Sequence, residues 1–239
     1  KGNVKKNNSI NFDLISLIEN NNTILFKNLN LSKDFKLINI DSFNFNYLNN
    51  KQVKNQLLLK KINSNYNIVG ESLDATKLIN KILDSDDTNS SLFHNLNSKI
   101  TLKINKTYID EINFINKLSG VLSFKNNKID NLNLVSTFPN NKKVNLTVKI
   151  NEKKEKITKF FTDYPKPLIK RYDFINGFEE GFLVYQSVKK DETSNGLLTI
   201  ENFKIREVPS FAKLLSLASL QGIADLLTGE GIRFNDFEM

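Results

Sequence analysis

The stretch that decides the fold is "GVLSFKNNKIDNLNLV", residues 120–135. Apolar and polar residues alternate on both sides of its centre, with Leu122 and Phe124 before it and Leu132 and Leu134 after it. A period of two is typical of a β-strand with one apolar and one polar face. The central "KNNK" favours a tight turn because asparagine tolerates positive φ angles. The stretch therefore predicts an antiparallel β-hairpin.

The same alternation recurs along the 239-residue chain, which predicts many more strands. It is clearest in "DSFNFNY" (41–47), "KITLKIN" (99–105) and "VNLTVKI" (144–150). Two further segments, "EGFLVYQ" (180–186) and "GLLTIEN" (196–202), are apolar on both faces, so we expect them to be covered on both sides. Because the turns are short, successive strands should be antiparallel neighbours. We predict a mainly β chain, a long curved antiparallel meander with two or three short helices.

Two short helices are predicted within this meander. The first spans residues 74–83, where Asp74 is placed to cap the N-terminus and the apolar residues share one side. The second lies near residues 163–172, around Pro165 and Pro167.

A third predicted helix, residues 208–227, is apolar around most of its circumference. Pro209 stands in its first turn and Gly229 stops it. Lys213 and Asp225 limit its uncharged run to a length below that of a membrane span. We therefore expect it to lie at an interface or in a core, and we expect a glycine turn and the start of a new strand to follow it.

The composition offers little for catalysis. The chain has no cysteine, which excludes disulfides, zinc-thiolate sites and thiol nucleophiles. Its single histidine, His94, lies in a polar stretch typical of a surface residue. Residues 84–95 resemble the start of a calcium loop but lack its glycine and its twelfth ligand. We predict no catalytic residue, no metal and no cofactor; a hydrolase that uses Asp84 or Glu180 is a remote alternative.

The charge of the chain does not indicate a polyanionic partner. Its net charge is +8, but the lysines are spread along the sequence and arginines are few. Nucleic-acid binding normally requires clustered basic residues, with arginine favoured for reading bases. We therefore predict no nucleic-acid partner and no small-molecule substrate.

The apolar sides of the strands are the remaining candidates for function. An apolar sheet face needs cover from a second sheet, a helix or a ligand. Two arrangements stay open: a closed sandwich core, or an open sheet that holds an apolar ligand. The candidate residues are Phe43, Phe45, Ile100, Leu102, Ile104, Leu122, Phe124, Leu132, Leu134, Val144, Leu146, Val148, Ile150, Phe182, Val184, Leu198 and Ile200.

The C-terminal segment reads "GLLTIENFKIREVPSFAKLLSLASLQGIADLLTGEGIRFNDFEM", residues 196–239. It resembles AsmA-like envelope proteins of the YhdP type. In that family a strand that ends in phenylalanine precedes a proline-started helix, a glycine turn and a new strand beginning "GI.F". The matching positions are Gly196, Phe203, Pro209, Leu214, Leu215, Ser219, Leu220, Gly222, Gly229, Gly231, Ile232 and Phe234. The likeness extends more loosely back to about Ile24, although Pro165 and "EG" at 180–181 replace the family's usual glycines.

The resemblance implies a long, taco-like β-groove from a periplasmic protein of Gram-negative bacteria. Such proteins are anchored in the inner membrane by an N-terminal helix and are implicated in moving phospholipid to the outer membrane. We accordingly expect residues 1–23 to be a lead-in strand or loop, 24–203 the groove segment, and 204–239 a helix, turn and next strand of a longer chain. The expected partners are phospholipid acyl chains and membranes, while a non-transporting scaffold for outer-membrane assembly is the alternative.

The apolar helix at 208–227 would then act on the groove. We hypothesise that it is a plug, a gate or a membrane-facing foot; a helix that merely completes a core is equally open. The residues concerned are Phe211, Leu214, Leu215, Leu217, Ala218, Leu220, Ile223 and Leu226.

Overall fold

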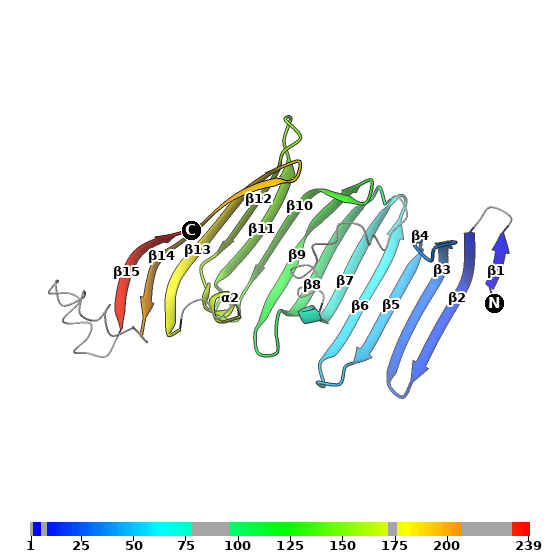
Figure 1. The fold of residues 1–239 in the computed structure, drawn as a ribbon. Coiled ribbons are helices and arrows are strands. Elements are labelled where there is room, and N and C mark those ends of the chain that lie inside the picture. The colour runs from blue at the N-terminus through cyan, green and yellow to red at the C-terminus, as the bar shows by residue number, and fades with distance from the viewer. Residues whose placement is uncertain (1, 6–8, 78–95, 172–175, 207–230) are drawn as a thin grey trace. The chain divides into compact units, whose positions relative to one another are not determined.

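The protein is described by a computed structural model, which covers residues 2–5, 9–77, 96–171, 176–206 and 231–239 (Figure 1). The chain forms two compact units, Lys1–Pro139 (unit 1) and Asn140–Met239 (unit 2). This division differs from the predicted boundaries. Ser9–Glu19 of the predicted lead-in is part of the unit 1 sheet, and the predicted last strand pairs within unit 2.

Unit 1 is a single open sheet in which sequence order and spatial order largely agree. Its strand order is β1-β2-β3-β5-β6-β7-β8-β9-β10, and β4 pairs with β3. The strands are β1 (Gly2–Lys5), β2 (Ser9–Glu19), β3 (Asn22–Ser32), β4 (Leu37–Asn39), β5 (Ser42–Leu48), β6 (Lys54–Ile62), β7 (Asn65–Asp74), β8 (Lys99–Tyr108), β9 (Phe114–Lys125) and β10 (Lys128–Thr137).

The predicted hairpin at residues 120–135 is confirmed. Strands β9 and β10 pair antiparallel, with Leu122 opposite Leu132. Asn126 and Asn127 form the turn with φ angles of 50° and 65°. Positive φ at both central residues is what a two-residue hairpin needs to match the twist of its strands. Asparagine at these positions therefore sets the register of the pair.

One pair in unit 1 departs from the predicted antiparallel meander. Strands β7 and β8 run parallel, with Tyr66 opposite Ile100 and Asp74 opposite Tyr108. A parallel neighbour needs a crossover that returns the chain to the starting end of the sheet. Residues 75–98 make this connection, and hairpin turn chemistry cannot reveal such a return.

Unit 2 is an open antiparallel sheet in the order β11-β12-β13-β14-β15. Its elements are β11 (Lys143–Ile150), β12 (Lys156–Thr162), α2 (Lys166–Arg171), β13 (Phe178–Lys190), β14 (Thr193–Ile205) and β15 (Ile232–Glu238). Strand β13 keeps one register with β14 along its length, because Glu180 faces Phe203 and Phe182 faces Glu201. Gly181 lies between these two pairs with a φ of 75°.

The fold-class prediction holds in its coarse form: the chain is mainly β, and the strands form open, curved, predominantly antiparallel sheet. The helix near 163–172 is confirmed as α2. At the predicted 74–83 helix, Thr76 and Lys77 are helical, and the Thr76 amide donates to Asp74 Oδ1 at 3.0 Å, as expected of a capping residue. The remainder of that helix and the whole of 208–227 lie outside the described residues.

Candidate functional site

The apolar side chains of unit 1 line up across the sheet. Directly paired residues of neighbouring strands project to the same side. One row of partners runs from Phe43 to Leu59, Ile68 and Leu102. The side of the sheet that carries this row is called the apolar face of unit 1.

All nine candidates from unit 1 lie on this face. Two rows adjoin the one above: Phe45, Leu57, Gly70 and Ile104 form the first, and Tyr66, Ile100, Leu122 and Leu132 form the second. Phe124 and Leu134 follow from the period of two along β9 and β10. These nine residues therefore share one face of the sheet, and their role as lipid contacts stays a prediction.

Most of these side chains remain partly accessible to solvent. Ile104 and Leu132 are buried, at 3% and 6% exposure. The other seven, Phe43, Phe45, Ile100, Leu102, Leu122, Phe124 and Leu134, are half-buried. Every described strand of unit 1 belongs to this one sheet, so no second described sheet of the unit covers the face. Half-buried side chains instead cover one another, as in the stacked rings of Phe26 and Phe43, 4.8 Å apart.

One end of the apolar face of unit 1 is closed locally. Leu96 and Ile40 are buried there beside Tyr66. The Leu96 amide donates to Asn127 Oδ1, and the Asn127 amide donates back to the Leu96 carbonyl, which fastens this segment to the β9–β10 turn. Burial raises the pKa of the Tyr66 hydroxyl, and the neighbouring Asp41 charge adds to the rise.

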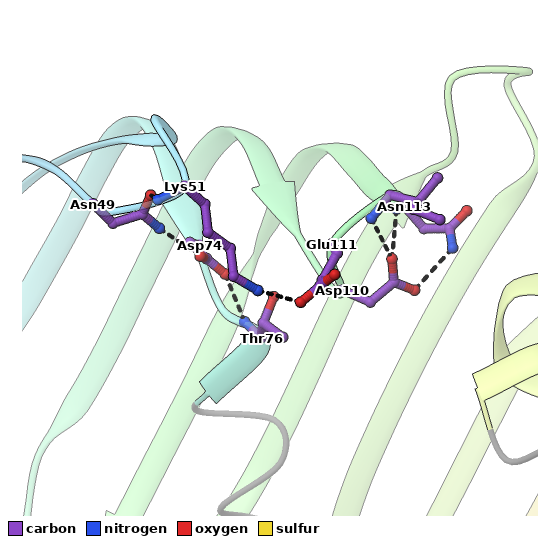
Figure 2. Close-up of polar contacts among 8 residues, drawn as sticks. Asn49, Lys51, Asp74, Thr76, Asp110, Glu111 and Asn113 are labelled. Atoms are coloured by element: carbon purple, nitrogen blue, oxygen red, sulfur yellow. Dashed lines mark hydrogen bonds and ion pairs between the residues drawn. The ribbon is translucent and has the colours of Figure 1, made fainter.

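The far end of unit 1 is polar (Figure 2). The Asp74 carboxylate accepts hydrogen bonds from the Asn49 side-chain amide and the Thr76 backbone amide, at 2.7 and 3.0 Å. Lys51 forms an ion pair with Glu111 across neighbouring loops. Because these carboxylates are already paired within the protein, they hold the strand ends together.

In unit 2, helix α2 covers part of one face, which is called the apolar face of unit 2. Ile169 of the helix packs on Phe178, Leu183, Ile200 and Phe203. Ile200 is fully buried. The candidates Val144, Leu146, Val148, Ile150, Leu198 and Ile200 lie on this face by register.

The structure separates two candidates from this group. Phe182 pairs with Glu201 and Val184 pairs with Thr199, which places both on the opposite face from Leu183. The expectation that this doubly apolar strand is covered on both sides is also wrong, because Val184 is 37% exposed. When both faces are apolar, periodicity cannot say which face a helix will choose.

Shallow depressions open to solvent lie on the two faces opposite the apolar ones. In unit 1 the depression includes Leu58, Val69 and Lys103, and in unit 2 it includes Val184 and Leu197. Leu197 is 50% exposed. The alternation of residues did not predict these depressions, because they form where apolar residues interrupt the polar side of a strand.

The adjacent carboxylates Glu179 and Glu180 take part in ion pairs. Glu179 Oε2 lies 2.9 Å from Arg206 Nε and Glu180 Oε1 lies 3.1 Å from Lys204 Nζ. Arg233 Nη1 is 3.6 Å from Glu180 Oε2. This arrangement fastens β13, β14 and β15 to one another.

Several predictions made from the sequence fall on undescribed residues. His94, Asp84 and the calcium-like loop are among these. So are all eight plug or gate candidates: Phe211, Leu214, Leu215, Leu217, Ala218, Leu220, Ile223 and Leu226. Within the described ranges there is no cluster of three or more residues suited to hold a metal ion, and no helix is long and apolar enough to cross a membrane.

Two lysines on the apolar face of unit 2 were missed by the sequence reasoning. Lys156 and Lys189 are direct partners on β12 and β13. The signal was present, because Lys156 is in phase with Thr158 and Phe160 in "KITKFFT". The partner on β13 required the register.

Comparison of the chain with protein-family models, curated proteins and solved structures finds no match. The resemblance to AsmA-like proteins therefore stays a prediction.

Proposed function

We propose that this chain binds the acyl chains of phospholipids on the apolar faces of its sheets. The observation that carries the proposal is the row of half-buried apolar side chains across unit 1, exemplified by Phe43 and Leu102. An apolar surface of this kind is uncommon without an occupant. A fatty chain fits it, because each buried methylene contributes about 0.8 kcal/mol and no polar group is left unsatisfied.

The wider role follows from the resemblance to AsmA-like proteins. We propose that the chain is a segment of a periplasmic protein that moves phospholipid between the inner and outer membranes along a groove. Passive movement of acyl chains needs an apolar surface and no reactive group. The scaffold for outer-membrane assembly is the rival, and it predicts a protein that carries no lipid.

Lipid extraction and native mass spectrometry of the purified chain test the proposal. We expect phospholipid to co-purify with the wild type. Leu102→Asn places an amide on the apolar face of unit 1, and we expect it to lower lipid occupancy several-fold.

Leu58→Asn is the matched control, because Leu58 is also a half-buried leucine but lies on the opposite face. It should leave occupancy unchanged, and circular dichroism should show both variants folded. Wild-type protein that is consistently free of lipid would refute the proposal and favour the scaffold. Equal losses in the two variants would show that the apolar face is not the binding surface.

A further inference from the structure

The apolar face of unit 2 changes character along its strands. Near α2, Leu183 faces Thr162 and Ile200. The next row along the strands contains Phe160 and Tyr185. Beyond it the side chains of β12 and β13 become polar, whereas Val148 and Ile150 of β11 remain apolar.

Two rows of polar residues complete this change. Thr158 and Ser187 face each other, and the following row pairs Lys156 with Lys189. Ser194 of β14 lies beside Lys189 in the same row. Along β12 and β13 the face thus runs from aromatic and aliphatic residues, through two hydroxyls, to two ammonium groups.

The two lysines repel each other across the strands. Directly opposed residues have Cβ atoms about 5 Å apart, at which like charges are destabilising. Neither ammonium group has a carboxylate within ion-pair distance in the described parts of the chain. The nearby Glu155 carboxylate accepts a hydrogen bond from the Asn151 side chain at 2.8 Å.

The surroundings of Lys156 disfavour its charged form. Burial lowers the pKa of Lys156, and the charge of Lys189 lowers it further. An anion between the two groups would offset this repulsion. A phosphate suits the place, because lysine binds it as a point charge and the neighbouring hydroxyls can donate to its oxygens.

We propose that Lys156 and Lys189 bind the phosphate of a phospholipid whose acyl chains lie on the aromatic rows around Phe160 and Tyr185. This inference rests on the proposed function and adds the headgroup class and the orientation of the lipid. The charge of the two lysines is complementary to the phosphate, and the polarity of the face follows that of the lipid from headgroup to chain.

The test measures three ligands by titration calorimetry with the full chain. They are dihexanoyl phosphatidic acid, dihexanoylglycerol, which lacks the phosphate, and inorganic phosphate. We expect the phosphate-bearing lipid to bind about 30-fold more tightly than dihexanoylglycerol, from two lysine contacts. Inorganic phosphate alone should bind more weakly than dihexanoyl phosphatidic acid.

The double variant Lys156→Gln/Lys189→Gln should lose this preference while it still binds dihexanoylglycerol. It should fold at least as stably as the wild type, because it removes a repulsion. The matched control is Lys149→Gln/Lys159→Gln. It removes the same charge from β11 and β12, but on the face of the sheet opposite the apolar face of unit 2. The control should keep the preference.

Each other outcome overturns the inference in a recognisable way. A preference that survives in the double variant, or that the control loses equally, rules out this lysine pair. If inorganic phosphate binds as tightly as dihexanoyl phosphatidic acid, the site binds free phosphate and not a lipid headgroup. If neither lipid binds to any of the proteins, the proposed function itself fails together with the inference.

Discussion

The stack of phenylalanines in unit 2 gives a prediction that can be worked out in numbers. Phe203 is 2% exposed and lies between two other rings. Its centroid is 5.4 Å from that of Phe178 and 5.2 Å from that of Phe234, with the planes at 20° and 11°. These three rings join β13, β14 and β15. They therefore support the register of β13, on which Lys189 lies.

Replacing Phe203 with alanine removes both ring contacts and leaves a cavity. Burial and cavity terms for Phe→Ala in a core amount to about 3–5 kcal/mol, and that range includes the lost contacts. We expect the free energy of opening β13–β15 to fall by about 4 kcal/mol. This corresponds to an opening equilibrium about 1,000-fold more favourable.

Hydrogen exchange read by mass spectrometry suits this prediction, because it reports each segment separately. Peptides from β13, β14 and β15 should lose about 1,000-fold in protection, whereas peptides from unit 1 should not change. Phe161→Ala is the control, because this half-buried ring lies on the opposite face, 6.4 Å from Phe182. Phe161→Ala should lower the free energy of opening β13–β15 by about 1 kcal/mol. A loss for Phe203→Ala no larger than that of the control would refute the packing argument.

Three further predictions concern single residues. Gly181→Ala should lower the free energy of unfolding by about 1–3 kcal/mol in urea titrations, because φ is 75° and the new Cβ would lie 2.8 Å from the Glu201 carbonyl oxygen; an unchanged midpoint would contradict this strain. The pKa of Lys156 is lowered in the folded state, so the wild-type free energy of unfolding should rise with pH between that pKa and the ordinary value of 10.5. Lys156→Met should remove this rise. Equal slopes of the free energy of unfolding against pH in the two proteins would contradict the prediction. The pKa of Tyr66 is raised above 10.0 in the folded state, so the contribution of its protonated hydroxyl to stability should be present below pH 10 and lost as the pH rises through the folded pKa. Tyr66→Phe should lack this alkaline loss when the free energy of unfolding is measured at increasing pH. Identical alkaline profiles would argue that the hydroxyl is not buried.

The sequence predicted the strands well because alternation is a local property. The six segments quoted for their pattern lie largely within strands, from β5 to β14. The asparagine turn at 126–127 was equally readable, because a positive φ is a constraint on single residues. The parallel pairing of β7 and β8 could not be predicted, because it depends on where the chain returns to the sheet and not on the residues of a tight turn.

The candidate face was predicted in unit 1 and only partly in unit 2. Leu102 and Ile104 stand in a strand with one apolar side, so their common face follows from the period of two. Phe182 and Val184 stand in a strand that is apolar on both sides, and the period gives no preference between the faces. The packing of α2 on Leu183 and Ile200 made that choice.

The sequence by itself determined which segments extend, where hairpins turn and which side chains share a side of each strand, since these depend on residues a few positions apart. Only the tertiary structure decided which strands are neighbours, which face receives a helix and which residues meet across strands. Lys156 and Lys189 show the difference, because 33 positions separate them in the chain and the register of β12 with β13 makes them partners. Such pairings depend on the free energy of the whole sheet, to which every strand contributes, and not on local preference.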